Sequence, residues 1–287
     1  MNRLAKTIAT AGLLTLSTAL WSLDTQRQLS LDVNGLDEFI VDVGAGSLSI
    51  EGKPGATQIA VEARITIDGV DKDEAEQWMQ DYMDLSLKQV KGKALLCATF
   101  SYNKRSDCST AKKLGSSWFG WNDERKIDLV VTMPQHLSLE VDDGSGSMQL
   151  SNLKADVFID DGSGDIEINN IAGHLQVDDG SGNLEITNIR GNLEVDDGSG
   201  NLSITDVEGD LYVEDGSGKL IIDQVTGEAE IEDGSGDIKI TNVAKKVYID
   251  DGSGSVHACH LGADLTVDDG SGEVDTCDDI KGKVVIK

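Results

Sequence analysis

The sequence predicts an all-β protein whose larger part is a parallel β-solenoid of about eight regular 18-residue coils. The first observation is an Asp-Asp-Gly-Ser-Gly element that occurs eight times without a slip in spacing, with Glu in place of the first Asp in two copies. Its first glycines are Gly144, Gly162, Gly180, Gly198, Gly216, Gly234, Gly252 and Gly270. A period that tolerates no insertion places every copy at the same point of one coil in a stacked structure.

The second observation is the pattern of apolar residues inside each coil. Leu184 and Ile186 stand four and six residues after the first glycine, and Leu193 and Val195 stand thirteen and fifteen residues after it. Such alternation is typical of half-buried strands. A further glycine at position eleven, such as Gly191, divides each coil into two nine-residue halves. We therefore expect two short parallel strands per coil. A three-sided helix of hexapeptides is the weaker alternative, because its apolar positions would recur every six residues.

The two acids before each glycine predict different roles. The Asp directly before the glycine can accept backbone N–H groups and form the turn. The preceding acid is Asp or Glu, which indicates an exposed position. Stacked coils would bring these outer carboxylates to about 5 Å from one another, where they repel, and a calcium-binding edge is one hypothesis. Its members are Asp142, Asp160, Asp178, Asp196, Glu214, Glu232, Asp250 and Asp268. In known calcium-binding β-helix repeats the Asp follows the glycines instead, which weighs against this hypothesis.

Composition and the N-terminus define the expected compartment. The chain carries 24 basic and 52 acidic residues, so nucleic acid and anionic membrane surfaces are excluded as partners. Residues 1–22 predict a signal peptide, with Arg3 and Lys6 before a short apolar stretch. An uncleaved anchor is the alternative. We expect an exported protein of the periplasm or cell surface, with no stable membrane span after cleavage.

Residues 38–135 predict a degenerate N-terminal part of the solenoid, before the regular repeats of residues 136–287. Residues 43–50 read VGAGSLSI, a degenerate copy of the turn and strand that lacks the paired acids. Ile59 and Val61 are expected to continue this coil. A helix is predicted over residues 71–83, where Asp71 and Glu74 form a capping box, and we expect it to cover the open end of the solenoid. Strands are predicted over residues 85–90, 94–100 and 127–133.

The loop of residues 97–126 differs in chemistry from the rest of the chain. Tyr102, Trp118, Phe119 and Trp121 occur there together with six Lys and Arg residues. This cluster is a candidate contact for a glycan or an envelope partner. The alternative is a disulfide-tied loop whose aromatic residues pack on the helix.

The four cysteines of an exported chain predict two disulfides. Cys97 and Cys108 are expected to flank the aromatic loop and to close it by pairing. Cys259 and Cys277 are 18 residues apart, at equivalent points of adjacent coils, and a disulfide between them can link the last two coils covalently. The competing interpretation is a metal site, because potential ligands are close in sequence to this second pair. These ligands are His257, His260, Asp275 and Asp278.

The sequence predicts neither a catalytic site nor a cofactor. Equivalent carboxylates in identical coils do not distinguish one acid from its neighbours, and the serine of each Gly-Ser-Gly is a turn residue. His136 and His174 have no evident nucleophile beside them in the sequence. No phosphate-binding loop or dinucleotide fingerprint is present.

These repeats, together with VGAGSLSI and the strand IDLVVTMP before the first full repeat, resemble the bacterial putative-adhesin family. That family consists of β-strand repeat domains of unknown function, related to adhesin-like head domains. The resemblance covers about residues 38–287 and implies an exported envelope protein with a parallel β-solenoid. We therefore expect a non-enzymatic envelope or surface protein that binds or scaffolds through its solenoid. The alternatives are a calcium-responsive structural rod and a polysaccharide-acting solenoid enzyme.

Overall fold

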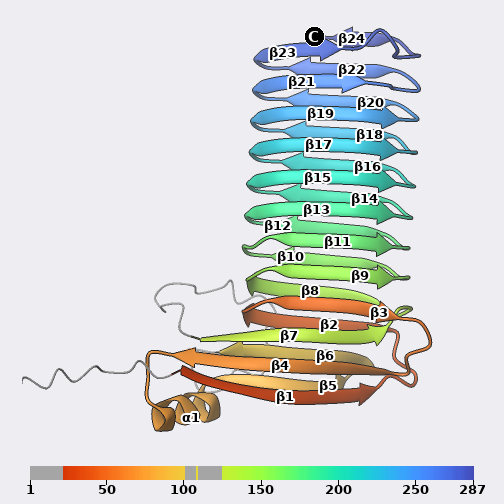
Figure 1. The fold of residues 1–287 in the computed structure, drawn as a ribbon. Coiled ribbons are helices and arrows are strands. Elements are labelled where there is room, and N and C mark those ends of the chain that lie inside the picture. Colours follow the sequence, from red (N-terminus) through yellow and green to blue (C-terminus); the bar gives the residue numbers. More distant parts are fainter. Residues whose placement is uncertain (1–21, 101–107, 109–124) are drawn as a thin grey trace, which may run out of the picture.

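The computed structural model describes residues 22–100, 108 and 125–287, and it shows a rod built from two facing sheets (Figure 1). Each sheet has 12 strands, and the core lies between the sheets. The predicted all-β parallel solenoid is confirmed. The predicted signal peptide lies outside the described residues, apart from Ser22. No helix in the described part of the chain is long and apolar enough to span a membrane.

Sheet A contains one strand of every coil, and its order along the rod begins at the N-terminal end. Its strands are β1 (Ser22–Asp32), β4 (Gln58–Asp68), β7 (Arg125–Pro134), β3 (Leu48–Lys53), β9 (Met148–Leu153), β11 (Ile166–Ile171), β13 (Gly182–Ile189), β15 (Gly200–Val207), β17 (Gly218–Val225), β19 (Gly236–Val243), β21 (Gly254–Cys259) and β23 (Gly272–Thr276).

Sheet B contains the other strand of every coil. In the same direction, its strands are β5 (Met83–Val90), β6 (Lys93–Phe100), β2 (Glu38–Ala45), β8 (Ser138–Ser145), β10 (Val157–Asp161), β12 (Leu175–Asp179), β14 (Leu193–Asp197), β16 (Leu211–Asp215), β18 (Ala229–Asp233), β20 (Val247–Asp251), β22 (Leu265–Asp269) and β24 (Val284–Ile286).

Residues that are 18 positions apart in the sequence pair with each other in neighbouring coils. Leu184 pairs with Leu202, and Leu193 pairs with Leu211, each in parallel. The aliphatic side chains therefore stack in columns, and the buried core residues of these coils are at most 3% exposed. A third inward position lies at the last residue of sheet A strands such as β13, which ends at Ile189. Burying one such aliphatic side chain contributes about 1.5–3 kcal/mol, so each coil stabilises the next through its apolar contacts.

Close approach between coils explains the recurring glycines. The second glycine of the turn has a positive φ, +152° at Gly182, and a Cβ atom there would lie 1.7 Å from the carbonyl oxygen of Gly164. At position eleven, a Cβ atom on Gly191 would lie 2.1 Å from the carbonyl oxygen of Gly173. Backbone of one coil thus occupies the space that a side chain of the next coil would need.

The degenerate copy forms a coil that stacks on the first regular one. Strand β2 pairs in parallel with β8, and β3 pairs in parallel with β9. The prediction for Ile59 and Val61 was wrong, because β4 stays in sheet A and runs antiparallel to both β1 and β7. A tight turn, in which the Ala56 N–H donates to the Lys53 carbonyl at 3.4 Å, reverses the chain between β3 and β4. Strand β1 also begins before the expected boundary at residue 38.

Helix α1 (Lys72–Asp81) begins as the capping pattern predicts. Asp71 accepts a hydrogen bond from the backbone N–H of Glu74 at 2.9 Å. The helix lies at the N-terminal end of the rod, where it contacts β1 and β5 (Figure 1). It ends two residues earlier than predicted, because Met83 begins β5, pairs with Phe100 and is buried.

Candidate functional site

The outward face of sheet B carries the strongest concentration of charge among the described strands. We call the outward side chains of β8, β10, β12, β14, β16, β18, β20 and β22 the acidic face. They form two columns, one containing eight carboxylates and the other containing three carboxylates, three aromatic rings and two neutral polar side chains, with no Lys or Arg. The first column is Asp142, Asp160, Asp178, Asp196, Glu214, Glu232, Asp250 and Asp268. The second column is Glu140, Phe158, Gln176, Glu194, Tyr212, Glu230, Tyr248 and Thr266.

The first of these columns, the outer acid column, consists of the residues predicted as a calcium edge. Its members pair in register along the rod, so neighbouring carboxylates follow the strand spacing of about 4.8 Å. One further member, Asp42 of β2, pairs with Asp142. The degenerate copy therefore retains the outer acid and has Val43 in place of the inner one. The position of Asp42 two residues before Gly44 was the available sequence signal.

Three members of the outer acid column, Asp42, Asp142 and Asp178, have raised pKa values, with burial as the main cause and repulsion by neighbouring carboxylates as the second. Burial, followed by the charge of Asp160, raises the pKa of Asp142. For Asp42, burial followed by the charges of Asp142 and Asp84 raises the pKa to about 6. Each adjacent pair of unit charges at this distance costs about 1 kcal/mol in water. A cationic ligand that lies along the column would remove this cost.

Tyrosines alternate with glutamates in the second column of the acidic face. Tyr212 and Tyr248 flank Glu230, and a shallow groove of about 580 Å³ passes beside them, also lined by Glu194 and His174. The Tyr212 hydroxyl donates a hydrogen bond to Glu214. That bond raises the pKa of Tyr212, so its hydroxyl stays protonated. The groove thus combines aromatic rings with carboxylates, a set of groups suited to cations.

The acids directly before each first glycine form a second, inner acid column. As predicted, they form turns: the Oδ1 atoms of five of them accept the backbone N–H of the serine two residues on, at 3.0–3.1 Å. The members are Asp143, Asp161, Asp179, Asp197, Asp215, Asp233 and Asp251.

Burial of the inner acid column was not predicted. These side chains point into the rod on the same side as the core residues of their strands and are only 1–4% exposed. The Oδ2 atom of every member lacks a hydrogen-bond partner among the described residues. Burial, followed by the charge of the next carboxyl, raises the pKa of Asp143 to about 8 and of Asp161 to about 7. A closely spaced column of buried charges is unfavourable, so Asp143 and Asp161 retain their protons to a much higher pH than an exposed Asp does.

A polar column at the opposite turn was missed by the sequence analysis. One residue per coil adopts a left-handed conformation there, with φ between 58° and 63°. These residues are Asn152, Asn170, Asn188, Asp206, Gln224, Asn242 and His260. Asn170 donates a side-chain hydrogen bond to Asn152 at 2.7 Å, and Asn188 donates one to Asn170 at 3.3 Å. The recurrence of Asn and Asp at this point of the period was the available signal.

The structure contains a disulfide between Cys97 and Cys108, with Cα atoms 6.0 Å apart. It ties β6 to the start of the aromatic loop. The candidate partner contacts in that loop, Tyr102, Trp118, Phe119 and Trp121, lie outside the described residues. Arg125 at the end of the loop lies 4.5 Å from the ring centre of Trp78 on α1.

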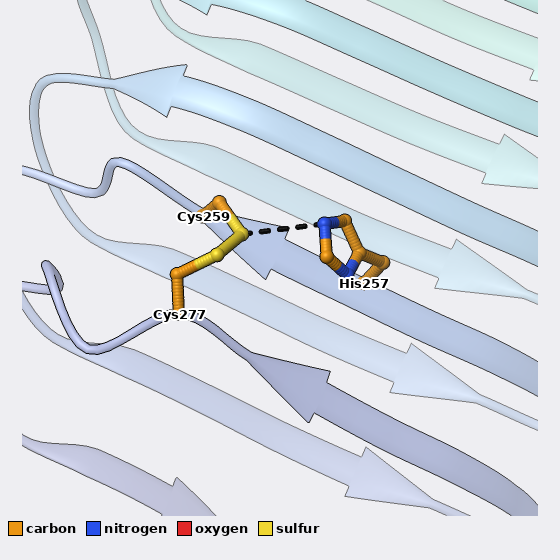
Figure 2. A group of neighbouring side chains, drawn as sticks. All are labelled: His257, Cys259 and Cys277. Atoms are coloured by element: carbon orange, nitrogen blue, oxygen red, sulfur yellow. Dashed lines mark hydrogen bonds between the residues drawn. A yellow bond between two sulfur atoms is a disulfide. The ribbon is translucent and has the colours of Figure 1, made fainter.

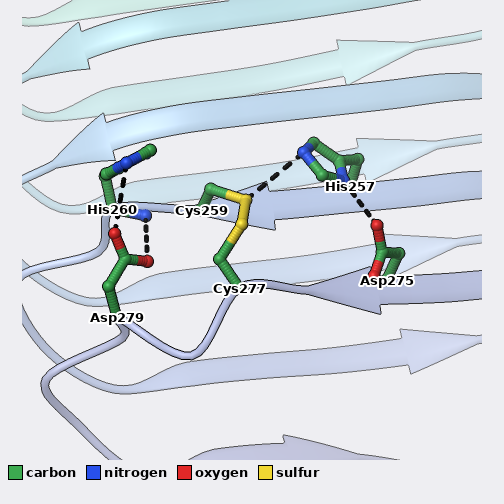
Figure 3. The surroundings of a disulfide bond; sticks show 6 residues. All are labelled: His257, Cys259, His260, Asp275, Cys277 and Asp279. Carbon is green, nitrogen blue, oxygen red and sulfur yellow. Dashed lines mark hydrogen bonds and ion pairs between the residues drawn. A yellow bond between two sulfur atoms is a disulfide. The ribbon is translucent and has the colours of Figure 1, made fainter.

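A disulfide also joins Cys259 and Cys277, the pair expected from their spacing, with Cα atoms 4.9 Å apart. Figure 2 shows His257 beside it, with Nε2 3.3 Å from Cys259 Sγ. Nδ1 of the same ring lies 2.9 Å from Asp275 Oδ2 (Figure 3).

The four residues of the predicted metal alternative do not form one group. His260 lies on the other side of the disulfide from His257 and pairs with Asp279, its Nε2 3.2 Å from Oδ2 (Figure 3). The group of possible metal ligands at this end of the described chain is instead His257 with the two cysteines.

Residues 42–276 match the family model described as Toastrack DUF4097. Among solved structures, a putative adhesin from Parabacteroides merdae is 15% identical, with coverage of 92% of this chain and 93% of that chain and a TM-score of 0.45. A putative adhesin from Bacteroides fragilis is 11% identical, with 92% and 96% coverage and a TM-score of 0.34. None of the curated proteins matches this chain.

Proposed function

Because the chain belongs to the Toastrack DUF4097 family, we propose that it is an exported, non-enzymatic envelope or surface protein of adhesin type that binds a cationic partner. The match bears out the family resemblance that the repeats indicate. The acidic face is the observation that carries the proposal. Its partner is an extended polycation, such as a lysine-rich segment of an envelope protein or an amino-sugar polymer.

The acidity is concentrated on one side of the rod. The outward positions of β9, β11, β13, β15, β17 and β19 on sheet A hold mainly Gln, Ser, Asn and Thr. Their charged residues are five carboxylates, partly offset by two cations: Glu167, Glu185, Asp206, Asp223 and Asp237, with Lys219 and Lys239. Both sheets belong to the same coils and have the same strand spacing. The difference between them is therefore a property of the side chains and gives the rod one strongly negative face.

Binding to this face gains from two physical effects. A polycation relieves the mutual repulsion of the outer acid column, and the long-range field steers its approach. The rings of Tyr212 and Tyr248 can then contact ammonium groups directly. The carboxylates are equivalent along the rod, which suits an extended ligand that makes the same contact several times.

The test is a calorimetric titration of the protein with a lysine-rich peptide, at low salt and at physiological salt. The double variant Asp178→Asn, Asp196→Asn removes two charges from the acidic face. Its matched control, Glu167→Gln, Glu185→Gln, removes two charges from sheet A. We expect the first variant to weaken binding at least threefold more than the control. Equal weakening by both variants would show that only net charge matters and would contradict a binding face.

A calcium-responsive rod is the second candidate, favoured by the unbroken register of the outer acid column. Two carboxylates and water can hold Ca²⁺ weakly, with dissociation constants on the order of 10⁻⁴–10⁻³ M. Thermal melting at low ionic strength with calcium, magnesium or chelator tests it. Stabilisation by calcium that Asp178→Asn, Asp196→Asn abolishes supports the rod, whereas an unchanged melting temperature rejects it.

A further inference from the structure

We propose that Cys259, Cys277 and His257 form a zinc site when the disulfide between the two cysteines is reduced. The disulfide and the metal site, which the sequence presents as alternatives, are then two states of one group of side chains. Reduction exposes two thiols beside an imidazole nitrogen, and a thiophilic divalent cation is the ligand that this donor set suits.

The backbone register brings the three donors together. His257 and Cys259 alternate on β21, so both belong to the outward side of that strand, and β21 pairs in parallel with β23 at the C-terminal end of the rod. Cys277 follows β23 directly. The three ligand atoms, one from each side chain, all lie within 4.8 Å of one another. Tetrahedral zinc with Zn–S of about 2.3 Å and Zn–N of about 2.0 Å places its donors roughly 3.5–3.8 Å apart, so small side-chain rotations suffice.

Asp275 prepares His257 for this role. Its Oδ2 atom lies 2.9 Å from Nδ1, a contact that favours the tautomer with the proton on Nδ1. The lone pair of Nε2 then faces Cys259 Sγ at 3.3 Å (Figure 2). A carboxylate behind the imidazole is the usual support of a histidine that binds zinc. Asp275 is therefore a positioning residue, and the fourth coordination position is left to water.

The site is accessible to a reductant and to the ion. Cys259 is 2% exposed, Cys277 is half-buried, and the His257 side chain is 42% exposed. A thiolate of an external dithiol attacks Cys277 Sγ, the S–S bond breaks, and Cys259 leaves as a thiolate beside His257. The second thiolate of the reductant then attacks the mixed disulfide, releases Cys277 and becomes a disulfide itself. Zinc binding subsequently displaces the remaining thiol protons to solvent.

The other disulfide provides an internal comparison. Cys97 and Cys108 are accompanied by the carboxylate of Asp84 in place of an imidazole. A carboxylate is a harder ligand than imidazole, so reduction there creates a donor set that suits zinc less well. Zinc binding in the reduced full-length chain is thus expected to depend on Cys259 and Cys277.

The experiment uses the full chain, oxidised or reduced with a phosphine that does not bind zinc, and titrates it with Zn²⁺ alone. Co²⁺ substitution provides a second readout, because thiolate-to-cobalt charge transfer reports sulfur ligands independently of stability. We expect reduced protein to bind one ion with this signature and oxidised protein to show none. Asp275→Asn should weaken zinc binding about tenfold or more without removing the signature.

Two identical substitutions discriminate the site from its surroundings. His257→Asn removes a proposed ligand and should weaken zinc binding at least tenfold, whereas His260→Asn alters the neighbouring pair with Asp279 and should leave binding unchanged. Circular dichroism of each variant checks that the rod is folded. The proposal is overturned if the reduced chain binds zinc no more tightly than Cys259→Ser, Cys277→Ser, or if His257→Asn and His260→Asn have equal effects.

Discussion

Replacing Asp161 with Asn should reduce the pH dependence of stability, while the same replacement at Asp160 should not. The two residues are adjacent in β10, but Asp161 faces the interior and is 2% exposed, whereas Asp160 belongs to the outer acid column. Asn is nearly isosteric with Asp and carries no charge. The pair therefore separates the effect of a buried carboxyl from the effect of net charge.

The expected magnitude follows from the pKa of Asp161. Burial, followed by the charge of Asp179, raises that pKa from 3.8 to about 7, and backbone N–H groups of Ser163 and Gly162 partly offset the rise. Between these two values the folded chain retains a proton that the unfolded chain has released. The stability from this group is therefore complete below about pH 4 and is lost as the pH rises through about 7. Three pH units at about 1.4 kcal/mol each correspond to about 4 kcal/mol for an isolated group. Coupling to neighbouring carboxyls and solvent screening at the turn reduce our expectation to about 2 kcal/mol.

Urea unfolding near pH 4 and near pH 8, monitored by circular dichroism, measures the effect. Wild type should lose more stability between the two pH values than Asp161→Asn, by about 2 kcal/mol. Near pH 4 the variant should be less stable than wild type by about 1 kcal/mol, because its amide N–H₂ lacks a partner. Near pH 8 the variant should be the more stable protein. If Asp161→Asn and Asp160→Asn change the pH dependence equally, the raised pKa of the buried carboxyl is refuted.

Three further changes test other features of the coils by unfolding measurements. Gly200→Ala should cost about 3 kcal/mol or more, because the added Cβ atom would lie 1.5 Å from a carbonyl oxygen of the preceding coil; Gly55→Ala, where the space is open, should cost about 1 kcal/mol. Asn188→Ala should cost about 1 kcal/mol at its left-handed φ of 58°, and Asn188→Gly clearly less; equal losses would rule out the backbone explanation. The double variant Cys259→Ser, Cys277→Ser removes a disulfide that closes a loop of 18 residues and should cost about 3 kcal/mol. Amide exchange in the last coils should become faster, and unchanged exchange would contradict a stabilising role of this disulfide.

The regular coils were predictable because their interactions are local and repeated. Apolar alternation determines which side chains face inward, and the constant period determines which residues pair between coils, as Leu184 with Leu202 shows. The N-terminal part was less predictable. Strand β4 has the same alternation as a solenoid strand, and alternation does not distinguish parallel from antiparallel pairing. Its partners were decided by the short turn after β3 and by contacts with β1 and β7.

The candidate sites divide in a similar way. The outer acid column and the pairing of Cys259 with Cys277 follow from the period. The direction in which a ring points does not, so the placement of His257 against the sulfur and of His260 against Asp279 needed the structure. The exchange of Asp and Glu indicated that the first acid of each pair is exposed, but neither pattern nor composition indicated that the second is buried without a partner for Oδ2.

The sequence by itself determined the architecture, since one period repeated without a slip leaves a single way to stack the coils. It also determined that each turn carries two adjacent acids. Only the tertiary structure decided that the second acid faces the core, on the side of sheet B opposite to the exposed first acid, as successive residues of a strand do. The acidic face and the raised pKa values of the inner acid column both arise from that alternation, because burial raises the energy of a charge that water would otherwise stabilise.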